Sequence, residues 1–300
     1  MHFPRSLLVP ALAAALAAAG CSRVPPNAAS EGQKALREGD YERAAVLLRA
    51  ATKAHPQNAD VFYNLGTAYF LAGHNRPAEE AFDRAVELSR DTDDWAPLVS
   101  RAETRRRRGN LDGAVNDYQA ALGKANRTAS LIAGLAACEL DRGNPGTALA
   151  LLEEALTTDP GDPVALYNAG VLHASGRLAD RDASKEHTEA ARLLQLFIVS
   201  RRAENCAAQR EDAIRRLGEL AMHRPPELQE KIDRLLMEAA RAASPAFAYE
   251  KAHQAWDLDR SNSVALARME RFARKKGDTR NANAIAECGR FLFPGDKRFE

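Results

Sequence analysis

Apolar residues follow a helical period through residues 60–88, with one break in the middle. Two stripes result, the first of Phe62, Leu65, Gly66 and Tyr69, the second of Ala78, Phe82 and Ala85. Spacings of three and four residues place each stripe on one side of a helix. Gly73 lies between the stripes and favours a sharp turn. The pattern predicts a helical hairpin whose two helices cannot bury their stripes alone.

The landmarks of this hairpin recur along the chain. Gly39, Gly73, Gly109 and Gly143 lie 34, 36 and 34 residues apart. Behind them, at constant offsets, follow Ala44, Ala78, Ala114 and Ala148, then Leu48, Phe82, Tyr118 and Leu152, then Ala51, Ala85, Ala121 and Ala155. Four units therefore share one packing scheme, and a period near 34 residues predicts an all-α solenoid.

The series Phe62, Leu65, Gly66, Tyr69, Ala78 and Phe82 resembles the tetratricopeptide repeat (TPR) signature. This resemblance implies a TPR-type α-solenoid of antiparallel helix pairs that form a superhelix. It also implies that the exposed faces of the first helices line a concave groove for an extended peptide or a partner helix.

Prolines and breaks in the apolar pattern predict the domain boundaries. A TPR array is expected over residues 25–222, with repeats at about 25–58, 59–92, 95–128, 129–162 and 163–201. The fifth repeat carries a polar insertion at 177–186, and a helix over 204–221 closes the array. Pro225 and Pro226 stop any helix, so a second helical subdomain is expected over 226–300, with a last repeat at 263–296.

One helix of the fifth repeat is apolar around most of its circumference. Residues 187–201 include Leu193, Leu194, Leu196, Phe197, Ile198 and Val199. An exposed helix would carry a narrower stripe, so this helix is expected to be covered on several sides, with the helix at 204–221 as one covering element.

The third repeat departs from the pattern. Arg101 and Arg105 occupy stripe positions that Leu65 and Tyr69 hold in the second repeat, and arginines fill residues 105–108. The helix macrodipole favours cations at a carboxyl end, so a solvated, well-capped helix end is the simpler interpretation. A surface that recognises anions is the alternative.

The amino terminus has the composition of an export signal over residues 1–20. Arg5 precedes an apolar run at 7–19, which is shorter than the ~20 residues of a membrane-spanning helix. The small residues before Cys21 resemble a bacterial lipobox, which implies lipidation of Cys21, a tether over 21–29 and an outer membrane lipoprotein facing the periplasm. Cleavage after Ala19, which would release a soluble periplasmic protein, is the alternative.

Composition and motifs offer little chemistry. The 42 Lys and Arg balance the 41 Asp and Glu, so no basic field favours nucleic acid. Cys138, Cys206 and Cys288 are expected to be structural thiols. Phosphate loops, nucleophile elbows and metal-ligand spacings are absent from the sequence, so no catalytic residue, metal or cofactor is predicted.

Function is therefore expected on the faces of the first helices that are free of packing. The candidate groove residues are Tyr63, Asn64, Thr67, Phe70, Glu103, Arg106, Arg107, Tyr167 and Asn168. Tyrosine offers rigid contact area, asparagine can bond to a peptide backbone, and arginine binds carboxylates.

The sequence thus favours a non-enzymatic scaffold or adaptor that binds envelope proteins or peptides and reaches the membrane through lipid on Cys21. By resemblance, pilus assembly, outer-membrane protein insertion and control of wall hydrolases are candidate settings. An all-helical periplasmic enzyme or glycan-binding protein, with a pocket near residues 177–186, is one alternative. A cytoplasmic nucleic-acid adaptor that uses Arg105 to Arg108 is another.

Overall fold

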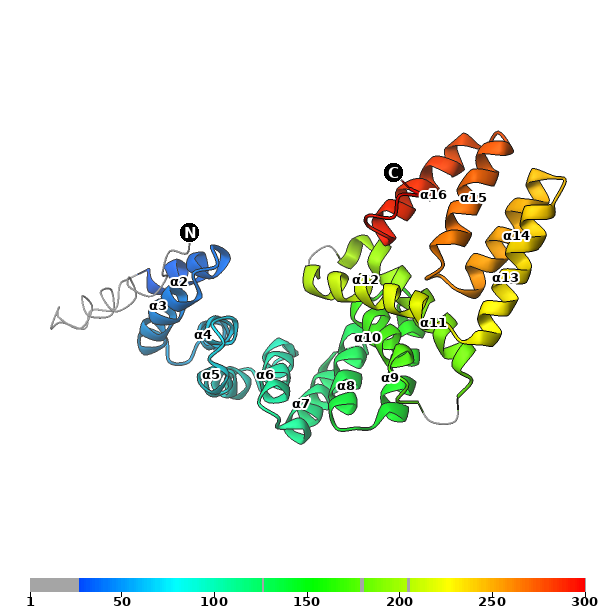
Figure 1. Ribbon diagram of the computed structural model, residues 1–300. Coiled ribbons are helices and arrows are strands. Elements are labelled where there is room, and N and C mark those ends of the chain that lie inside the picture. Colours follow the sequence, from blue (N-terminus) through cyan, green and yellow to red (C-terminus); the bar gives the residue numbers. More distant parts are fainter. Residues whose placement is uncertain (1–26, 126, 179–180, 204–205, 300) are drawn as a thin grey trace. The chain divides into compact units, whose positions relative to one another are not determined.

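The computed structural model describes residues 27–125, 127–178, 181–203 and 206–299. These residues form fifteen α-helices and one short 3-10 turn, without strands. The chain divides into two compact units, residues 1–127 and 128–300 (Figure 1). Residues 1–20 and Cys21 lie outside the described part, so the export signal and the lipid anchor stay predictions.

The first unit consists of three helical hairpins. They are α2 (Ala28–Arg37) with α3 (Tyr41–Ala54), α4 (Ala59–Leu71) with α5 (Asn75–Leu88), and α6 (Ala96–Arg107) with α7 (Leu111–Lys124). Each helix packs on its hairpin partner, and α3 packs on α4 as α5 does on α6. This arrangement confirms the predicted all-α stack of antiparallel helix pairs.

The second unit continues with hairpins and one single helix. Its helices are α8 (Ala129–Asp141), α9 (Pro145–Thr158), α10 (Pro163–Ala174), α11 (Ala183–Val199), α12 (Ala207–Met222), α13 (Pro226–Arg241), α14 (Pro245–Leu258), α15 (Ser263–Lys275) and α16 (Thr279–Leu292). Helices α13 to α16 lie side by side, each packed on the next (Figure 1). The polar insertion is shorter than predicted, because Asp182 caps α11 by accepting from the backbone amides of Ser184 and Lys185.

The turns within the hairpins need glycine. Gly73 has a φ of 86°, in the left-handed region that side chains with a Cβ avoid. The next amide, that of His74, donates to the carbonyl of Tyr69 over 2.8 Å, which closes a Schellman motif. Gly39, Gly109, Gly143 and Gly277 have φ values of 79–83° at the equivalent positions.

In three hairpins a glycine of the first helix makes room for a bulky side chain of the second. A Cβ added to Gly66 would lie 2.6 Å from the ring of Phe82, which is 1% exposed. Gly32 approaches Leu48 and Gly170 approaches Leu194 in the same way. This close approach fixes the distance between the paired helices.

Helix α11 is covered on several sides, as its apolar arc predicts. Leu194, Phe197 and Ile198 are at most 1% exposed. Helix α10 packs on one side of α11, α12 on another, and α16 also touches it. The cysteine prediction is confirmed for Cys138, which is buried, whereas the free thiols Cys206 and Cys288 are half-buried. Burial raises the pKa of the Cys288 thiol.

Candidate functional site

Side chains from two successive first helices meet in the first unit. The guanidinium carbon of Arg107, on α6, lies 3.8 Å from the centre of the Phe70 ring, on α4. Glu103 accepts from Nε and Nη2 of Arg106 over 2.9 and 2.8 Å, and its carboxylate lies 3.6 Å from Nε of Arg107. We call Phe70, Glu103, Arg106 and Arg107 the α4–α6 surface. It presents an aromatic face, cations and a carboxylate within one patch.

The other candidate residues of α4 have partial roles inside the fold. The ring of Tyr63 lies 5.9 Å from that of Phe82 and is tilted against it. Thr67 donates its hydroxyl to the carbonyl of Tyr63 over 3.0 Å. Asn64 is half-buried. Tyr63 thus anchors the hairpin with its ring and leaves only part of its surface for contacts.

Tyr167 and Asn168 belong to the second unit. The Tyr167 hydroxyl donates to Asp212, on α12, over 2.8 Å, and its ring lies 5.3 Å from that of Phe197. Burial and the Asp212 carboxylate both raise the pKa of Tyr167. Asn168 is half-buried. The structure therefore uses Tyr167 to hold α12 against α10.

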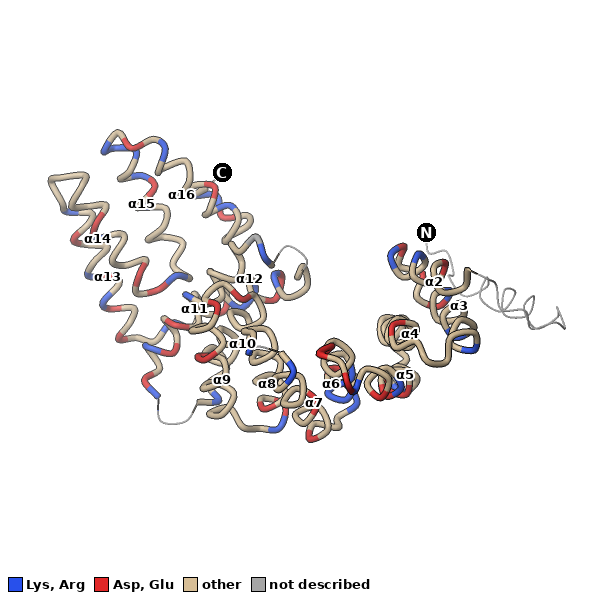
Figure 2. The backbone as a smooth tube through the Cα atoms, turned by 180° about the vertical axis from the view of Figure 1, so that it is seen from behind, with Lys and Arg blue, Asp and Glu red and all other residues tan. Residues whose placement is uncertain are grey.

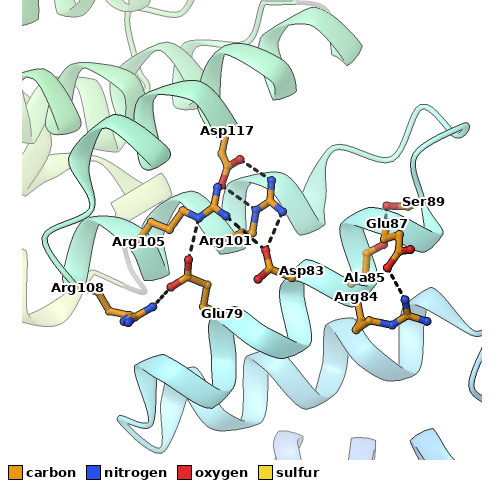
Figure 3. A network of polar contacts seen from close by, with 10 residues as sticks. All are labelled: Glu79, Asp83, Arg84, Ala85, Glu87, Ser89, Arg101, Arg105, Arg108 and Asp117. Carbon is orange, nitrogen blue, oxygen red and sulfur yellow. Dashed lines mark hydrogen bonds and ion pairs between the residues drawn. The ribbon is translucent and has the colours of Figure 1, made fainter.

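The arginines of the third hairpin form an ion network (Figure 3). Its members are Arg101, Arg105 and Arg108 with Glu79, Asp83 and Asp117. Arg101 donates to both carboxylate oxygens of Asp117, over 2.9 and 2.6 Å, and to Asp83 over 2.9 Å. Arg105 donates to Glu79 and Asp117, each over 2.9 Å. The interpretation of residues 105–108 as a solvated helix end is wrong for Arg105, whose side chain is 19% exposed.

This ion network occupies the place of an apolar cluster one repeat earlier. In the second hairpin, Leu65 packs with Ala45 and Ala81, and Tyr69 packs against the same cluster. By repeat position, Arg101 and Arg105 replace Leu65 and Tyr69, Glu79 replaces Ala45, and Asp117 replaces Ala81. Each apolar contact thus has an ionic counterpart.

Burial and ion pairing act in opposite directions on Glu79. Burial opposes its ionisation, but the hydrogen bonds from Arg105 and Arg108 outweigh it, and the pKa of Glu79 is lowered. The three arginines are thereby neutralised within the fold. Because Arg105 and Arg108 bind carboxylates of their own unit, they are poorly placed to bind nucleic acid.

The second unit contains a cavity of about 890 Å³ at the predicted insertion, lined by residues of α9, α10, α11, α13 and α14 and by Arg181 and Asp182. Nδ1 of His173 lies 2.6 Å from Glu186, and Arg181 lies 3.4 Å from the same carboxylate. The hydrogen bond from Arg192 lowers the pKa of Glu189, which also lines the cavity. A general acid needs a raised pKa, so the lowered pKa of Glu189 does not favour that role.

Sequence reasoning missed a buried polar cluster in the second unit. Asp259, fully buried after α14, accepts from the amide and hydroxyl of Ser261 over 2.8 and 2.5 Å. It also pairs with Arg224 and lies 3.4 Å from Nε2 of His187, on α11. Burial raises the pKa of Asp259, but the neighbouring His187 side chain, the charge of Arg224 and the hydrogen bond from Ser261 outweigh it, and the pKa falls to about 2.

The sequence did contain a signal for this cluster. Asp159 follows α9 as Asp259 follows α14, and Asp159 accepts from the amide of Gly161, two residues on, over 3.0 Å. The shared pattern identifies Asp259 as a residue of the turn between repeats. Its burial depends on His187 and Arg224, which no local pattern reveals.

Within the described ranges, no three His, Cys, Asp or Glu side chains converge as metal ligands. None of the described helices has the length and apolar character needed to cross a bilayer.

Family models match the hairpins directly. One model described as tetratricopeptide repeat matches residues 35–102, and a second with the same description matches residues 99–163 and 139–201. This chain carries tetratricopeptide repeats. The TPR matches end at residue 201, and the hairpins α13/α14 and α15/α16 lie beyond them.

Related proteins agree with the TPR fold. The chain is 30% identical over 105 residues to "Tetratricopeptide repeat protein 37" of Xenopus laevis, which covers 35% of this chain but 7% of that relative. The chain therefore spans less than a tenth of that relative's length.

Solved structures show the same architecture. The APC/C hetero-tetramer Cut9-Hcn1 superposes with a TM-score of 0.51 at 14% identity, over 89% of this chain and 46% of that chain. A thermophilic TPR protein of Thermus thermophilus superposes with a TM-score of 0.50 at 21% identity, over 64% of this chain and 97% of that chain. These likenesses support the solenoid fold.

Proposed function

We propose that this protein is a non-enzymatic scaffold that holds partner proteins or peptides on the α4–α6 surface. TPR proteins generally act as scaffolds for protein interactions. The observation that carries the proposal is the stacking of Arg107 on Phe70 at 3.8 Å, with Glu103 and Arg106 beside them. Aromatic and arginine side chains dominate binding energy at protein interfaces, and here they are already ordered before a partner arrives.

We also propose that the scaffold acts in the bacterial cell envelope, anchored to the outer membrane by lipid on Cys21. The support is the apolar run at 7–19 followed directly by small residues and Cys21. An anchor would confine the α4–α6 surface near the membrane and raise the effective concentration of partners there. Release as a soluble periplasmic protein is the alternative.

The cavity near the insertion motivates a second candidate, an enzyme or glycan-binding protein. Its volume of about 890 Å³ is that of a ligand site. Its lining offers carboxylates and histidine but no aromatic ring on which a sugar could stack, and the pKa of Glu189 is lowered. The scaffold therefore has the better support.

Photo-crosslinking in the native envelope tests the scaffold. We expect proteins crosslinked by the wild-type chain to be lost when Phe70→Ala and Arg107→Ala are combined, because the aromatic anchor and its cation disappear together. Arg76→Ala is the matched control, since Arg76 is exposed on α5 and, within the described part of the chain, pairs only with Glu80 over 3.5 Å. Identical crosslinks from all three chains would refute the assignment of the surface.

Membrane fractionation tests the anchor. Cys21→Ser removes the thiol that would carry the lipid, so the protein should move from the outer membrane fraction to the soluble periplasm. Unchanged fractionation would refute lipidation and leave the scaffold proposal standing.

A further inference from the structure

The second unit contains a separate candidate surface, distinct from the α4–α6 surface of the first unit. Helices α13 and α15 line a cavity of about 310 Å³, with Met237 and Ala240 on one side and Val264 and Arg268 on the other. Arg268 joins the two helices by donating to the carbonyl of Leu236 over 2.5 Å. We call this region the α13–α15 face.

Apolar side chains on this face are open to water. Met237 is 56% exposed and Val264 is 37% exposed, although large apolar side chains usually avoid water. Leu236 closes the bottom of the cavity and is buried. An apolar side chain from another molecule would fit between Met237 and Val264 and would remove both from water.

The rim of this face is basic. Arg234 and Arg241 lie three residues before and four after Met237, and Arg271 lies three residues after Arg268, so helical spacing places all three beside the cavity. All three are exposed, and among the described residues none has a carboxylate partner. Figure 2 shows further cations at the end of α15.

The nearby carboxylates cancel only part of this charge. Asp233 lines the cavity and accepts from Nε2 of Gln229 over 2.7 Å, while Glu270 is paired with Arg274 on its own helix. Arg268 spends one donor on a neutral carbonyl and keeps its full charge. Charge complementarity therefore selects an anionic partner.

We propose that the α13–α15 face docks an acidic segment of a partner protein, with an apolar side chain in the cavity and carboxylates on Arg234, Arg241 and Arg271. The inference rests on the proposed scaffold function and names a second contact surface for it. Arg234 and Arg241 are seven residues apart, or about 10 Å along a helix. A segment in the polyproline II conformation rises about 3.1 Å per residue and repeats its side-chain direction every third residue, so carboxylates at every third position match the two arginines.

Protein fits this face better than nucleic acid or a membrane surface. Binding of single-stranded nucleic acid relies on aromatic side chains that stack with bases, and the cavity lining has none. Met237 and Val264 are too few for insertion into a bilayer but sufficient for one apolar side chain.

Fluorescence anisotropy with the full chain tests the proposal. The probe is a labelled twelve-residue peptide that repeats Glu-Leu-Ala, and the comparison peptide has Gln in place of Glu. We expect the Glu peptide to bind at least about tenfold more tightly than the Gln peptide. Reversing both charges with Arg234→Glu and Arg241→Glu should weaken binding at least about tenfold, and Met237→Ser about fivefold.

The matched control is Arg280→Glu combined with Lys297→Glu. It changes the net charge of the same unit equally, on exposed residues of α16 and the segment after it. Binding within about twofold of wild type supports the α13–α15 face. An equal loss in control and test variants would show general charge attraction and overturn the proposal.

Two further probes decide the class of partner. Tighter binding of a single-stranded oligonucleotide, or of phosphatidylglycerol vesicles, than of the Glu peptide would overturn the protein assignment. Failure here is distinguishable from failure of the scaffold function, because the crosslinks that depend on Phe70 and Arg107 do not require Arg234 or Arg241.

Discussion

The hairpins α4/α5 and α6/α7 follow one backbone scheme but are joined to the preceding hairpin by different chemistry. Leu65 and Tyr69 pack on a cluster that includes Ala45 of the preceding hairpin, whereas Arg101 and Arg105 bind the carboxylates of Asp83 and Glu79 in the hairpin before theirs. We call the packing of Leu65 and Tyr69 the apolar joint and the ion pairs of Arg101 and Arg105 the ionic joint. The apolar joint needs only side chains of matching volume, while the ionic joint needs each donor to face its acceptor.

The comparison shows that the TPR scheme separates two tasks. The alanine and aromatic positions within a hairpin hold its two helices together, and both hairpins keep them, as Phe82 and Tyr118 illustrate. The positions between hairpins can change from apolar to ionic without altering the backbone. The following substitutions test that separation.

The largest expected effect is on packing within a hairpin. Phe82→Ala removes a ring that is 1% exposed and leaves a cavity beside Gly66, so the free energy of unfolding of the first unit should fall by about 3–5 kcal/mol. Urea unfolding and hydrogen exchange of α4 and α5 would measure it. Phe70→Ala, on the surface of the same hairpin, should cost less than about 1 kcal/mol. Equal losses would show that burial does not decide the effect.

The next effect concerns the ion network. Asp117→Ala removes the buried carboxylate that Arg101 and Arg105 share within their own hairpin, and leaves these side chains, 15% and 19% exposed, with the half-exposed Asp83 as their shared acceptor. We expect a loss of about 2–3 kcal/mol in urea unfolding, somewhat less than for fully buried pairs. Asp83→Ala is the control, because Asp83 is 47% exposed and should cost under about 1 kcal/mol. An unchanged free energy of unfolding in Asp117→Ala would mean that the ion pairs of Asp117 with Arg101 and Arg105 do not stabilise the unit.

A polar cluster in the second unit extends the comparison to pH. The pKa of Asp259 falls from 3.8 to about 2 on folding, so its contribution is present above pH 4 and is lost as the pH falls from 4 to 2. Over that range the wild-type unit should lose about 2 kcal/mol more stability than Asp259→Asn. Asp257→Asn, exposed on α14, should follow wild type. Parallel pH profiles for all three chains would contradict the lowered pKa.

The smallest net effect is expected from converting the ionic joint into the apolar one. The combination of Glu79→Ala, Arg101→Leu, Arg105→Tyr and Asp117→Ala copies the second hairpin. Because desolvation offsets much of the gain from buried ion pairs, stability should change by no more than about 1 kcal/mol or should rise. The variant should also lose the part of the acid sensitivity that comes from the lowered pKa of Glu79. A loss as large as that of Asp117→Ala would show that the ionic joint is specifically stabilising.

The sequence predicted much of the fold because its signals are local. Gly73 and the stripe of Phe62, Leu65 and Tyr69 lie within one hairpin, and each needs only its own backbone period to be interpreted. The register of Arg101 with the apolar stripe was visible for the same reason.

The partners of the charged residues were less accessible. Arg105 binds Glu79, 26 residues away in the preceding hairpin, and His187 lies against Asp259 in another hairpin. Both pairings depend on how hairpins stack, which no single period encodes. For the candidate site, the sequence listed the residues of the α4–α6 surface, but the stacking of Arg107 on Phe70 required coordinates.

The ionic joint also specifies which hairpin can precede the third one. Near-identical modules could in principle be joined in any order, since each presents the same greasy edge to the next. The hairpin that carries Arg101 and Arg105 requires a preceding hairpin with Glu79 and Asp83 in place. Deleting or exchanging a hairpin would therefore leave charged side chains unpaired at the contact between hairpins. This requirement would disfavour contacts between the wrong hairpins while the nascent polypeptide folds. It would also disfavour recombination within this part of the array.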